Sequence, residues 1–301
     1  MSDGESAISG PPGYPKIILF GDSLTERSFE SVNNGFGKVL TAYYAGWADG
    51  FPGQFRYNST WLRNFFMGII GTLESMNSCP PLFITVFLGA NDACLPPTSA
   101  HVPLPEFEAN LRYYVDTILS HPMTKGTKVI LITPPPIEVH PFRSETADNP
   151  SVQESLIRSV KTGRGYQTYM SKKLYAEKVM GIAKSYQEQT DLVAGLDFWT
   201  ALVNFGHENG KRSESGPSEI DDEILPGSGL PGATSFGRAV LVDGLHLGPL
   251  GYKVLSRELL ALITEKWPEL QKEALPLQTQ SLEDDCQTHG ASAEVRKVDE
   301  R

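Results

Sequence analysis

Three short apolar segments, each followed at once by a turn, constrain the fold of this chain more than any other feature. They are Lys16 to Phe20, Leu82 to Leu88 and Lys128 to Thr133. A glycine follows each of the first two, and a triple proline that cannot continue a hydrogen-bonded ladder follows the third. Short apolar runs with such boundaries are typical of strands that are buried on both faces of a parallel sheet.

Segments with helical spacing lie between these strands. From Pro105 to Leu119, apolar side chains recur every three or four residues, and Pro105 suits the first turn of a helix. Further helices are predicted over 36–44, 166–189 and 252–266, and a further strand over 192–196. Strands that alternate with helices predict an α/β fold around a mainly parallel sheet.

The ends of the chain and two internal segments depart from this pattern. Residues 1–14 are small and polar and predict a flexible N-terminus, while 276–301 are polar and acidic and predict a disordered tail. Between them, 15–275 are expected to form a single domain. The segment from His140 to Arg164 is polar and has no clear hydrophobic period. The segment from Phe205 to Gly237 is rich in Gly, Ser, Pro and charged residues, so we interpret this second segment as a long surface insertion. One hypothesis for its role is a lid over the site.

Composition excludes several classes of function. The 301 residues are 40% hydrophobic, which is enough for a sizeable core. A formal net charge of −10, without clustered Lys and Arg, argues against nucleic-acid binding. No segment approaches the roughly 18 apolar residues of a membrane span, and the N-terminus lacks the pattern of a secretory signal. We therefore expect a cytoplasmic protein with a small-molecule substrate; nothing in the sequence specifies an oligomeric state.

No cofactor and no metal ion are expected. The three cysteines form no C-x-x-C pair, and neither H-E-x-x-H nor another clustered His/Cys pattern is present. The glycine-rich motifs G-x-G-x-x-G and G-x-x-x-x-G-K-[ST] are absent too, which disfavours a phosphate or nucleotide binder. The G-x-S-x-G elbow of α/β-hydrolases is also missing.

Polar side chains follow two of the predicted strands. Gly21, Asp22 and Ser23 come after the first strand, and Asn91 follows the strand that ends near Leu88. Functional groups gather at the carboxyl edge of open parallel sheets, so a reactive serine hydroxyl at this edge is plausible. Taken alone, Ser23 is more often a helix cap and Asn91 an Asx-turn residue.

Near the C-terminus, Asp243 precedes His246 by three residues. At this spacing, a carboxylate can accept a hydrogen bond from imidazole Nδ1–H and leave Nε2 free to act as a base. The alternatives are a turn aspartate and a surface or metal-bound histidine, but the further ligands that a metal ion needs are not apparent.

Together, these blocks resemble the SGNH or GDSL-type hydrolases. GDSLTE spans Gly21 to Glu26, GAND spans Gly89 to Asp92, and DGLH spans Asp243 to His246. The stretches VFLGANDA, VPLPEF and DGLHL are similar to the branch of isoamyl acetate-hydrolysing esterases. The resemblance implies a doubly wound, flavodoxin-like α/β/α sandwich of three layers.

The resemblance also implies the roles of the residues. Ser23 would be the nucleophile, His246 the general base and Asp243 the group that orients the imidazole. The oxyanion hole would use the Ser23 N–H, the Asn91 amide and a glycine N–H, for which Gly53 is the candidate and Gly50 the alternative.

The resemblance implies a serine esterase that hydrolyses short-chain carboxylic esters, acetates in particular, through an acyl-enzyme. Thioesterase, lysophospholipase and carbohydrate deacetylase activities belong to the same scaffold and stay open. A non-catalytic binding protein that has kept the fold is the alternative from another class. The presence of all four polar residues, Ser23, Asn91, Asp243 and His246, argues against it.

Overall fold

The computed structural model describes residues 15–30, 32–45, 49–51, 57–75, 79–139, 168–213, 225–230 and 232–274. Within these ranges, five parallel strands form one sheet in the order β2-β1-β3-β4-β5. They are β1 (Lys16–Gly21), β2 (Asp49–Phe51), β3 (Phe83–Phe87), β4 (Lys128–Ile132) and β5 (Val193–Leu196). This order is that of flavodoxin-like sheets, in which the direction of winding reverses between β1 and β3.

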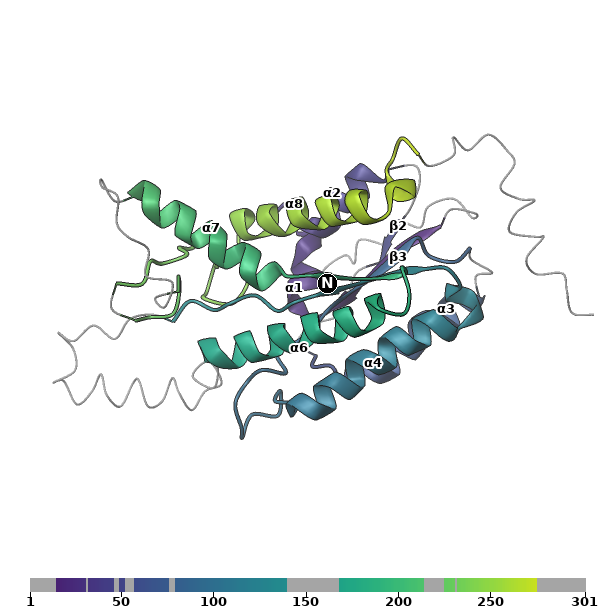
Figure 1. Ribbon diagram of the computed structural model, residues 1–301, viewed down its shortest axis with the longest axis horizontal. Helices are drawn as coiled ribbons and strands as arrows, with labels where there is room; N and C mark the ends of the chain where they lie inside the picture. The colour runs from purple at the N-terminus through teal and green to yellow at the C-terminus, as the bar shows by residue number, and fades with distance from the viewer. Residues whose placement is uncertain are drawn as a thin grey trace, which may run out of the picture.

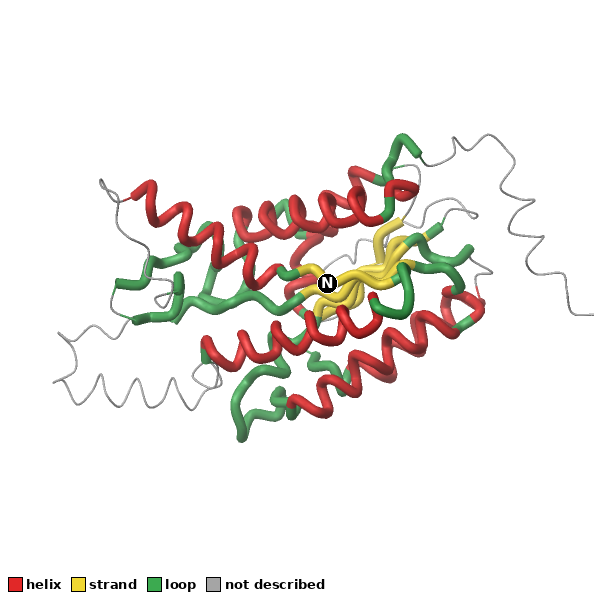
Figure 2. The backbone as a smooth tube through the Cα atoms, in the orientation of Figure 1, coloured by secondary structure: helices red, strands yellow, loops and turns green. Residues whose placement is uncertain are grey.

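Helices cover both faces of the sheet, which makes three layers (Figures 1 and 2). One face carries α2 (Phe36–Tyr43), α7 (Phe198–Ser213) and α8 (Pro249–Lys266). The other carries α3 (Leu62–Ser75), α4 (Leu104–Ser120) and α6 (Tyr169–Gln187). The short elements are α1 (Ser23–Glu26), η1 (Arg27–Phe29), η2 (Pro122–Thr124) and η4 (Pro268–Leu270). The predicted α/β/α sandwich is confirmed.

The core lies on both sides of the sheet, and β1 contributes to each side in turn. Ile17 and Leu19 pack in the cluster that contains α2, α7 and α8. Ile18 and Phe20 pack in the cluster that contains α3, α4 and α6. Because both faces are covered, the strand is apolar at successive positions, which is why it was visible in the sequence as a continuous run.

The register of the central strands brings two turns to one edge of the sheet. Gly21, the last residue of β1, is paired with Phe87, the last residue of β3. The chain therefore leaves both strands at the same level, toward Ser23 from β1 and toward Asn91 from β3. This edge at the switch point is where ligands bind in open α/β sheets.

Several predicted elements are confirmed and others need correction. The strands β1, β3, β4 and β5 and the helices α2, α4, α6 and α8 lie within a few residues of their predicted positions. The sequence analysis missed β2, α3 and α7. No strand was expected near Gly50, yet this residue lies within β2, where a run of three residues left no pattern to detect.

The predicted surface insertion from Phe205 to Gly237 is wrong over its first part, because α7 continues to Ser213. Its later part packs against the chain after β4: the Val139 N–H donates to the Gly227 carbonyl at 2.7 Å. The whole segment from His140 to Arg164, the N-terminal segment and the C-terminal tail lie outside the described residues. Among the helices of the described ranges, none has the length and apolar character that crossing a bilayer requires.

Candidate active site

Ser23 lies at the end of β1, where the chain turns sharply into α1. A side chain at Gly21 would place its Cβ 2.1 Å from Thr25 Oγ1 and 2.7 Å from the Phe87 carbonyl oxygen, so this position requires glycine. Asp22 caps α1, since its Oδ1 accepts a hydrogen bond from the Leu24 N–H at 2.9 Å. The cap function that seemed the simplest role for the serine thus belongs to its neighbour, and Ser23 is left to present its hydroxyl group.

The Ser23 hydroxyl meets His246 across a separation of 223 residues. Ser23 Oγ lies 3.1 Å from His246 Nε2. His246 Nδ1 lies 2.9 Å from Asp243 Oδ2 on the other side of the ring. The structure therefore brings Ser23, His246 and Asp243 together in the predicted order.

The Asp243–His246 turn is organised by local hydrogen bonds. Asp243 Oδ1 accepts from the N–H groups of Leu245 at 3.2 Å and His246 at 2.9 Å. Gly244 has a φ of +87°, and a Cβ there would lie 3.0 Å from the Glu138 carbonyl oxygen. The turn is closed by the Val242 N–H, which donates to the His246 carbonyl at 2.8 Å.

The charge of Asp243 determines which nitrogen of His246 can accept a proton from Ser23. Partial burial acts to raise the pKa of Asp243, but the hydrogen bonds from the His246 backbone and ring outweigh it and lower the pKa to about 2. An ionised carboxylate can only accept, so His246 Nδ1 carries the proton and Nε2 presents a lone pair to Ser23. This arrangement can draw the proton from a serine hydroxyl as the oxygen attacks a carbonyl carbon.

Asn91 lies in the turn after β3, beside the residue that precedes Ser23. The turn starts at Gly89, which has a φ of +112°. Asn91 Nδ2 donates to the Tyr57 carbonyl at 3.0 Å and lies 3.4 Å from Asp22 Oδ2. The structure thus places the amide at the switch point with Ser23, as the sequence predicted.

Three buried ionisable residues beneath this edge were missed by the sequence analysis: Asp22, Asp92 and Lys172, each 0% exposed. Burial raises the pKa of Asp22 to about 7. Burial also raises the pKa of Asp92, to about 6, against the hydrogen bonds from Ser59 that lower it. A signal for Lys172 was present, because it lies on the apolar face of α6 with Tyr175, Ala176 and Val179.

Of the two glycine candidates for the oxyanion hole, the structure describes only Gly50. Gly50 lies within β2 and is paired with Ile17, four residues before Gly21. At about 3.3 Å per residue, it lies about 13 Å short of the edge that carries Ser23, which disfavours it. Gly53 lies outside the described residues and stays a prediction. Within the described ranges, no group of three or more His, Cys, Asp or Glu side chains is arranged to hold a metal ion.

Comparison with known proteins decides the family. The model of the GDSL-like lipase/acylhydrolase family matches residues 17–259. This chain belongs to the GDSL hydrolase family. Members of this family are esterases and acylhydrolases, so this GDSL protein is a hydrolase that acts on carboxylic esters.

Curated relatives match this GDSL protein over most of their length. A GDSL esterase/lipase from Arabidopsis thaliana is 31% identical over 269 residues, which cover 87% of this chain and 90% of the relative. The isoamyl acetate-hydrolyzing esterase 1 homolog of Rattus norvegicus is 30% identical over 279 residues, which cover 90% and 91%.

Solved structures share the fold at low sequence identity. The acetyl xylan esterase AlAXEase aligns with a TM-score of 0.52 at 14% identity, over 82% of this chain and 99% of that one. Axe2, an acetylxylan esterase from Geobacillus stearothermophilus, aligns with a TM-score of 0.50 at 19% identity, over 84% and 95%. These likenesses support the three-layer fold of this GDSL hydrolase.

Proposed function

We propose that this GDSL hydrolase is a serine esterase for short-chain esters, acetates in particular, and that Ser23, His246 and Asp243 form its catalytic triad. The observation that carries the proposal is the 3.1 Å contact between Ser23 Oγ and His246 Nε2. It joins a hydroxyl group to a base whose other nitrogen is held by a carboxylate. Such a base is required, because a serine hydroxyl is a weak nucleophile near neutral pH.

In the first half of the reaction, Ser23 Oγ attacks the ester carbonyl carbon while its proton moves to His246 Nε2. Asp243 stabilises the imidazolium ion that forms. The carbonyl oxygen becomes an oxyanion, which the Ser23 N–H and the Asn91 amide stabilise. Asn91 Nδ2 lies 3.0 Å from the Tyr57 carbonyl and 3.4 Å from Asp22 Oδ2, and in the proposed reaction the oxyanion replaces Asp22, the more distant acceptor. Such a donor contributes about 3 to 4 kcal/mol.

The tetrahedral intermediate then collapses. The bond to the alcohol oxygen breaks, the alcohol takes the proton from His246 Nε2, and an acyl group stays on Ser23. In the second half, His246 removes a proton from a water molecule that attacks the acyl carbon, and returns it to Ser23 Oγ as the acid leaves. Asp243 keeps its charge throughout, in accord with its pKa of about 2.

The proposed preference for acetate rests on the relatives. A chain 30% identical to this one over 279 residues is named as a homologue of an isoamyl acetate-hydrolyzing esterase. An acetyl group needs little room beyond the oxyanion site, so rates should fall as the acyl chain grows. Thioesters, lysophospholipids and acetylated sugars are the competing substrate classes.

The test measures kcat/KM for p-nitrophenyl acetate, butyrate and octanoate, and then for an acetyl thioester and an acetylated xylo-oligosaccharide. We expect the acetate to be the best of the three nitrophenyl esters, and the thioester and the sugar to be slower. Ser23→Ala should lower turnover of the acetate by at least about 10³-fold. Ser75→Ala, a change at an exposed serine of α3, is the matched control and should leave turnover unchanged.

Two results would contradict the proposal in different ways. Undiminished turnover in Ser23→Ala would remove the serine mechanism. Faster hydrolysis of the octanoate than of the acetate would keep the mechanism and overturn the substrate class.

A further inference from the structure

Lys172 is a lysine without access to solvent, in the first turn of α6. Burial of a charged ammonium group is unfavourable by several kcal/mol unless charges and hydrogen-bond acceptors surround it. Burial accordingly lowers the pKa of Lys172, and nearby Cys94, Asp22 and Asp92 act to raise it. A residue with this energetic penalty would be replaced easily by an apolar one if its only task were to fill space.

The polar partner of Lys172 is a carbonyl next to Asn91. Its Nζ donates a hydrogen bond to the Ala90 carbonyl oxygen. The adjacent residue, Ser171, donates through Oγ to the Ala93 carbonyl at 2.8 Å. The first turn of α6 therefore binds the backbone on both sides of Asn91.

Two further segments also bind the turn that contains Asn91. Asp92 Oδ1 accepts from the Ser59 N–H at 2.8 Å, and the Asp92 carbonyl accepts from the Val102 N–H at 3.1 Å. Asp92 and Asp22 are the two buried carboxyl groups with which Lys172 interacts electrostatically. One buried lysine thus lies near the carboxyl groups of both turns that meet at the switch point, the turn of Ser23 and the turn of Asn91.

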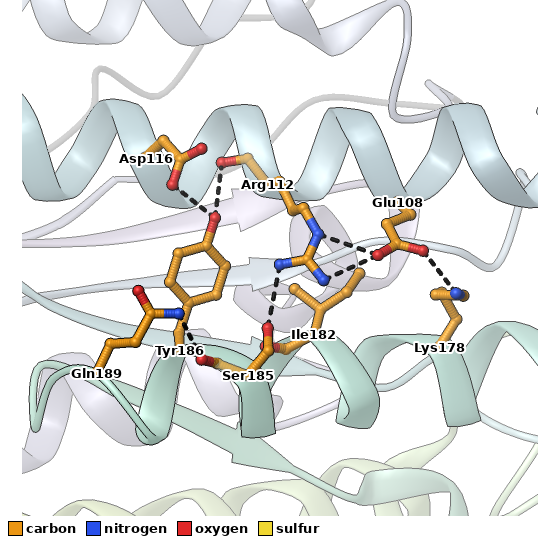
Figure 3. Close-up of polar contacts among 8 residues, drawn as sticks. All are labelled: Glu108, Arg112, Asp116, Lys178, Ile182, Ser185, Tyr186 and Gln189. Atoms are coloured by element: carbon orange, nitrogen blue, oxygen red, sulfur yellow. Dashed lines mark hydrogen bonds and ion pairs between the residues drawn. The ribbon is translucent and has the colours of Figure 1, made fainter.

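The rest of α6 is fixed on α4, so Lys172 cannot withdraw toward solvent without breaking other contacts. Figure 3 shows the polar contacts between these two helices. Glu108 of α4 accepts from Lys178 at 2.6 Å, and Arg112 of α4 donates to Ser185 at 3.0 Å. Tyr186 donates to Asp116 at 2.6 Å. At the start of α6, Thr168 and Ser171 form a capping box.

We propose that Lys172 is a positioning residue for the oxyanion side of the active site: it holds the Ala90 carbonyl, and so the turn that presents Asn91. The inference rests on the proposed function of Ser23 and Asn91. Because oxyanion donors act only when they are placed within a fraction of an ångström, a small displacement of the turn lowers kcat and leaves substrate binding nearly unchanged.

The experiment is a double-mutant cycle between Lys172→Met and Asn91→Ala, with kcat and KM measured on p-nitrophenyl acetate. Lys172→Met should lower kcat about 10- to 100-fold and change KM by less than about threefold. In the Asn91→Ala background, the same change should lower kcat by less than about threefold, because the group that Lys172 positions is gone. Lys173→Met, one residue along the same helix, is the matched control and should leave kcat unchanged.

Ser171→Ala covers the case in which Lys172→Met does not fold. This variant removes the hydrogen bond to the Ala93 carbonyl, together with the Ser171 side of the capping box, and keeps Lys172. It should lower kcat about three- to tenfold in the wild-type background and leave it unchanged in the Asn91→Ala background.

The outcomes separate the two proposals. Wild-type kcat in folded Lys172→Met, or an equal loss with and without Asn91, overturns the role of Lys172. If Lys172→Met does not fold, then no loss in Ser171→Ala, or an equal loss in both backgrounds, does the same. Full activity in Ser23→Ala overturns the proposed function itself, and that result does not depend on Lys172.

Discussion

The two halves of the proposed active site are built in different ways. Ser23 and Asn91 follow central strands, and the residues around them, such as Asp22 and Asp92, are buried and hydrogen-bonded to distant segments. Asp243 and His246 lie in a partly exposed turn. The hydrogen bonds that orient the imidazole join residues two to four apart, and one bond from a distant segment, from the Glu138 N–H to the Gly244 carbonyl at 2.8 Å, holds the turn. We call these the buried half and the surface half.

The two halves differ in what fixes the positions of their functional groups. In the surface half, the carboxylate, two N–H groups and the imidazole orient one another within a short stretch of sequence, and the Glu138 N–H is the one distant donor to this stretch. In the buried half, the position of each group is fixed by strand register, by the Tyr57 carbonyl and by α6. Substitutions in the surface half should therefore affect chemistry and little else, whereas those in the buried half should affect stability too.

The largest effect is expected for Asp243→Asn. The variant keeps an oxygen that can accept from the backbone, but it removes the charge that supports the imidazolium ion, so kcat should fall about 10³- to 10⁴-fold. The pKa of about 2 means that the wild-type carboxylate is ionised from about pH 4 upward, so protonation of Asp243 itself adds no pH dependence to the loss over pH 5 to 8. Its melting temperature should stay close to that of Asp191→Asn, an exposed control; a kcat within tenfold of wild type would contradict the role of Asp243.

Asn91→Ala should lower kcat about 10²- to 10³-fold with KM nearly unchanged, because the amide acts on the oxyanion and not on the ground state. Steady-state kinetics on p-nitrophenyl acetate measure this effect. Asn64→Ala, an exposed change on α3, serves as the control. A rise in KM with wild-type kcat would make Asn91 a binding residue instead.

A pair of glycine substitutions tests whether changes in the buried half reduce stability more than changes in the surface half. Gly21→Ala places a Cβ within 2.1 Å of Thr25 Oγ1 in the buried half, where the structure has no room to relax. We expect a loss of about 3 kcal/mol in the free energy of unfolding. Gly244→Ala in the surface half imposes a positive φ on alanine, brings its Cβ to 3.0 Å from the Glu138 carbonyl oxygen, and should lose about 1 to 2 kcal/mol. Denaturant titrations measure both, and a reversed order would contradict the division into halves.

The smallest effect is expected for Asp22→Asn and should depend on pH. Burial raises the pKa of Asp22 to about 7, above the value of an unfolded aspartate, so its contribution to stability is greatest at low pH and is lost as pH rises toward 7. The variant has no such loss. Relative to wild type it should gain at least about 1 kcal/mol between pH 4 and 8, since one pKa unit corresponds to about 1.4 kcal/mol. A difference that stays constant with pH would contradict this account.

Much of the fold could be predicted from local pattern. The strands β1, β3 and β4 are continuous apolar runs because both faces of the sheet are covered. The helix α3 was missed although Leu62, Phe66 and Ile70 recur every four residues. Only three residues form β2, and α7 ends in a polar segment, so neither gave a pattern that stood apart from a loop.

The residues of the candidate site also differ in how far they could be predicted from the sequence. The surface half could be recognised from DGLH, because the hydrogen bonds that orient its imidazole are local. Asn91 was predicted, but its partner, the Tyr57 carbonyl, was not, since backbone groups have no sequence signature. The network of Asp22, Asp92 and Lys172 depends on α6 meeting the turn after β3, a contact between residues 82 apart. Only the position of Lys172 on an apolar helix face pointed toward it.

The most direct test of the account is the rate at which a fluorophosphonate probe modifies the protein, with the modified residue identified by peptide mass spectrometry. We expect one adduct, on Ser23, that forms at least about 10²-fold more slowly in His246→Ala, because Ser23 and His246 react as a pair. An adduct on another serine, or equal rates in the two proteins, would contradict it.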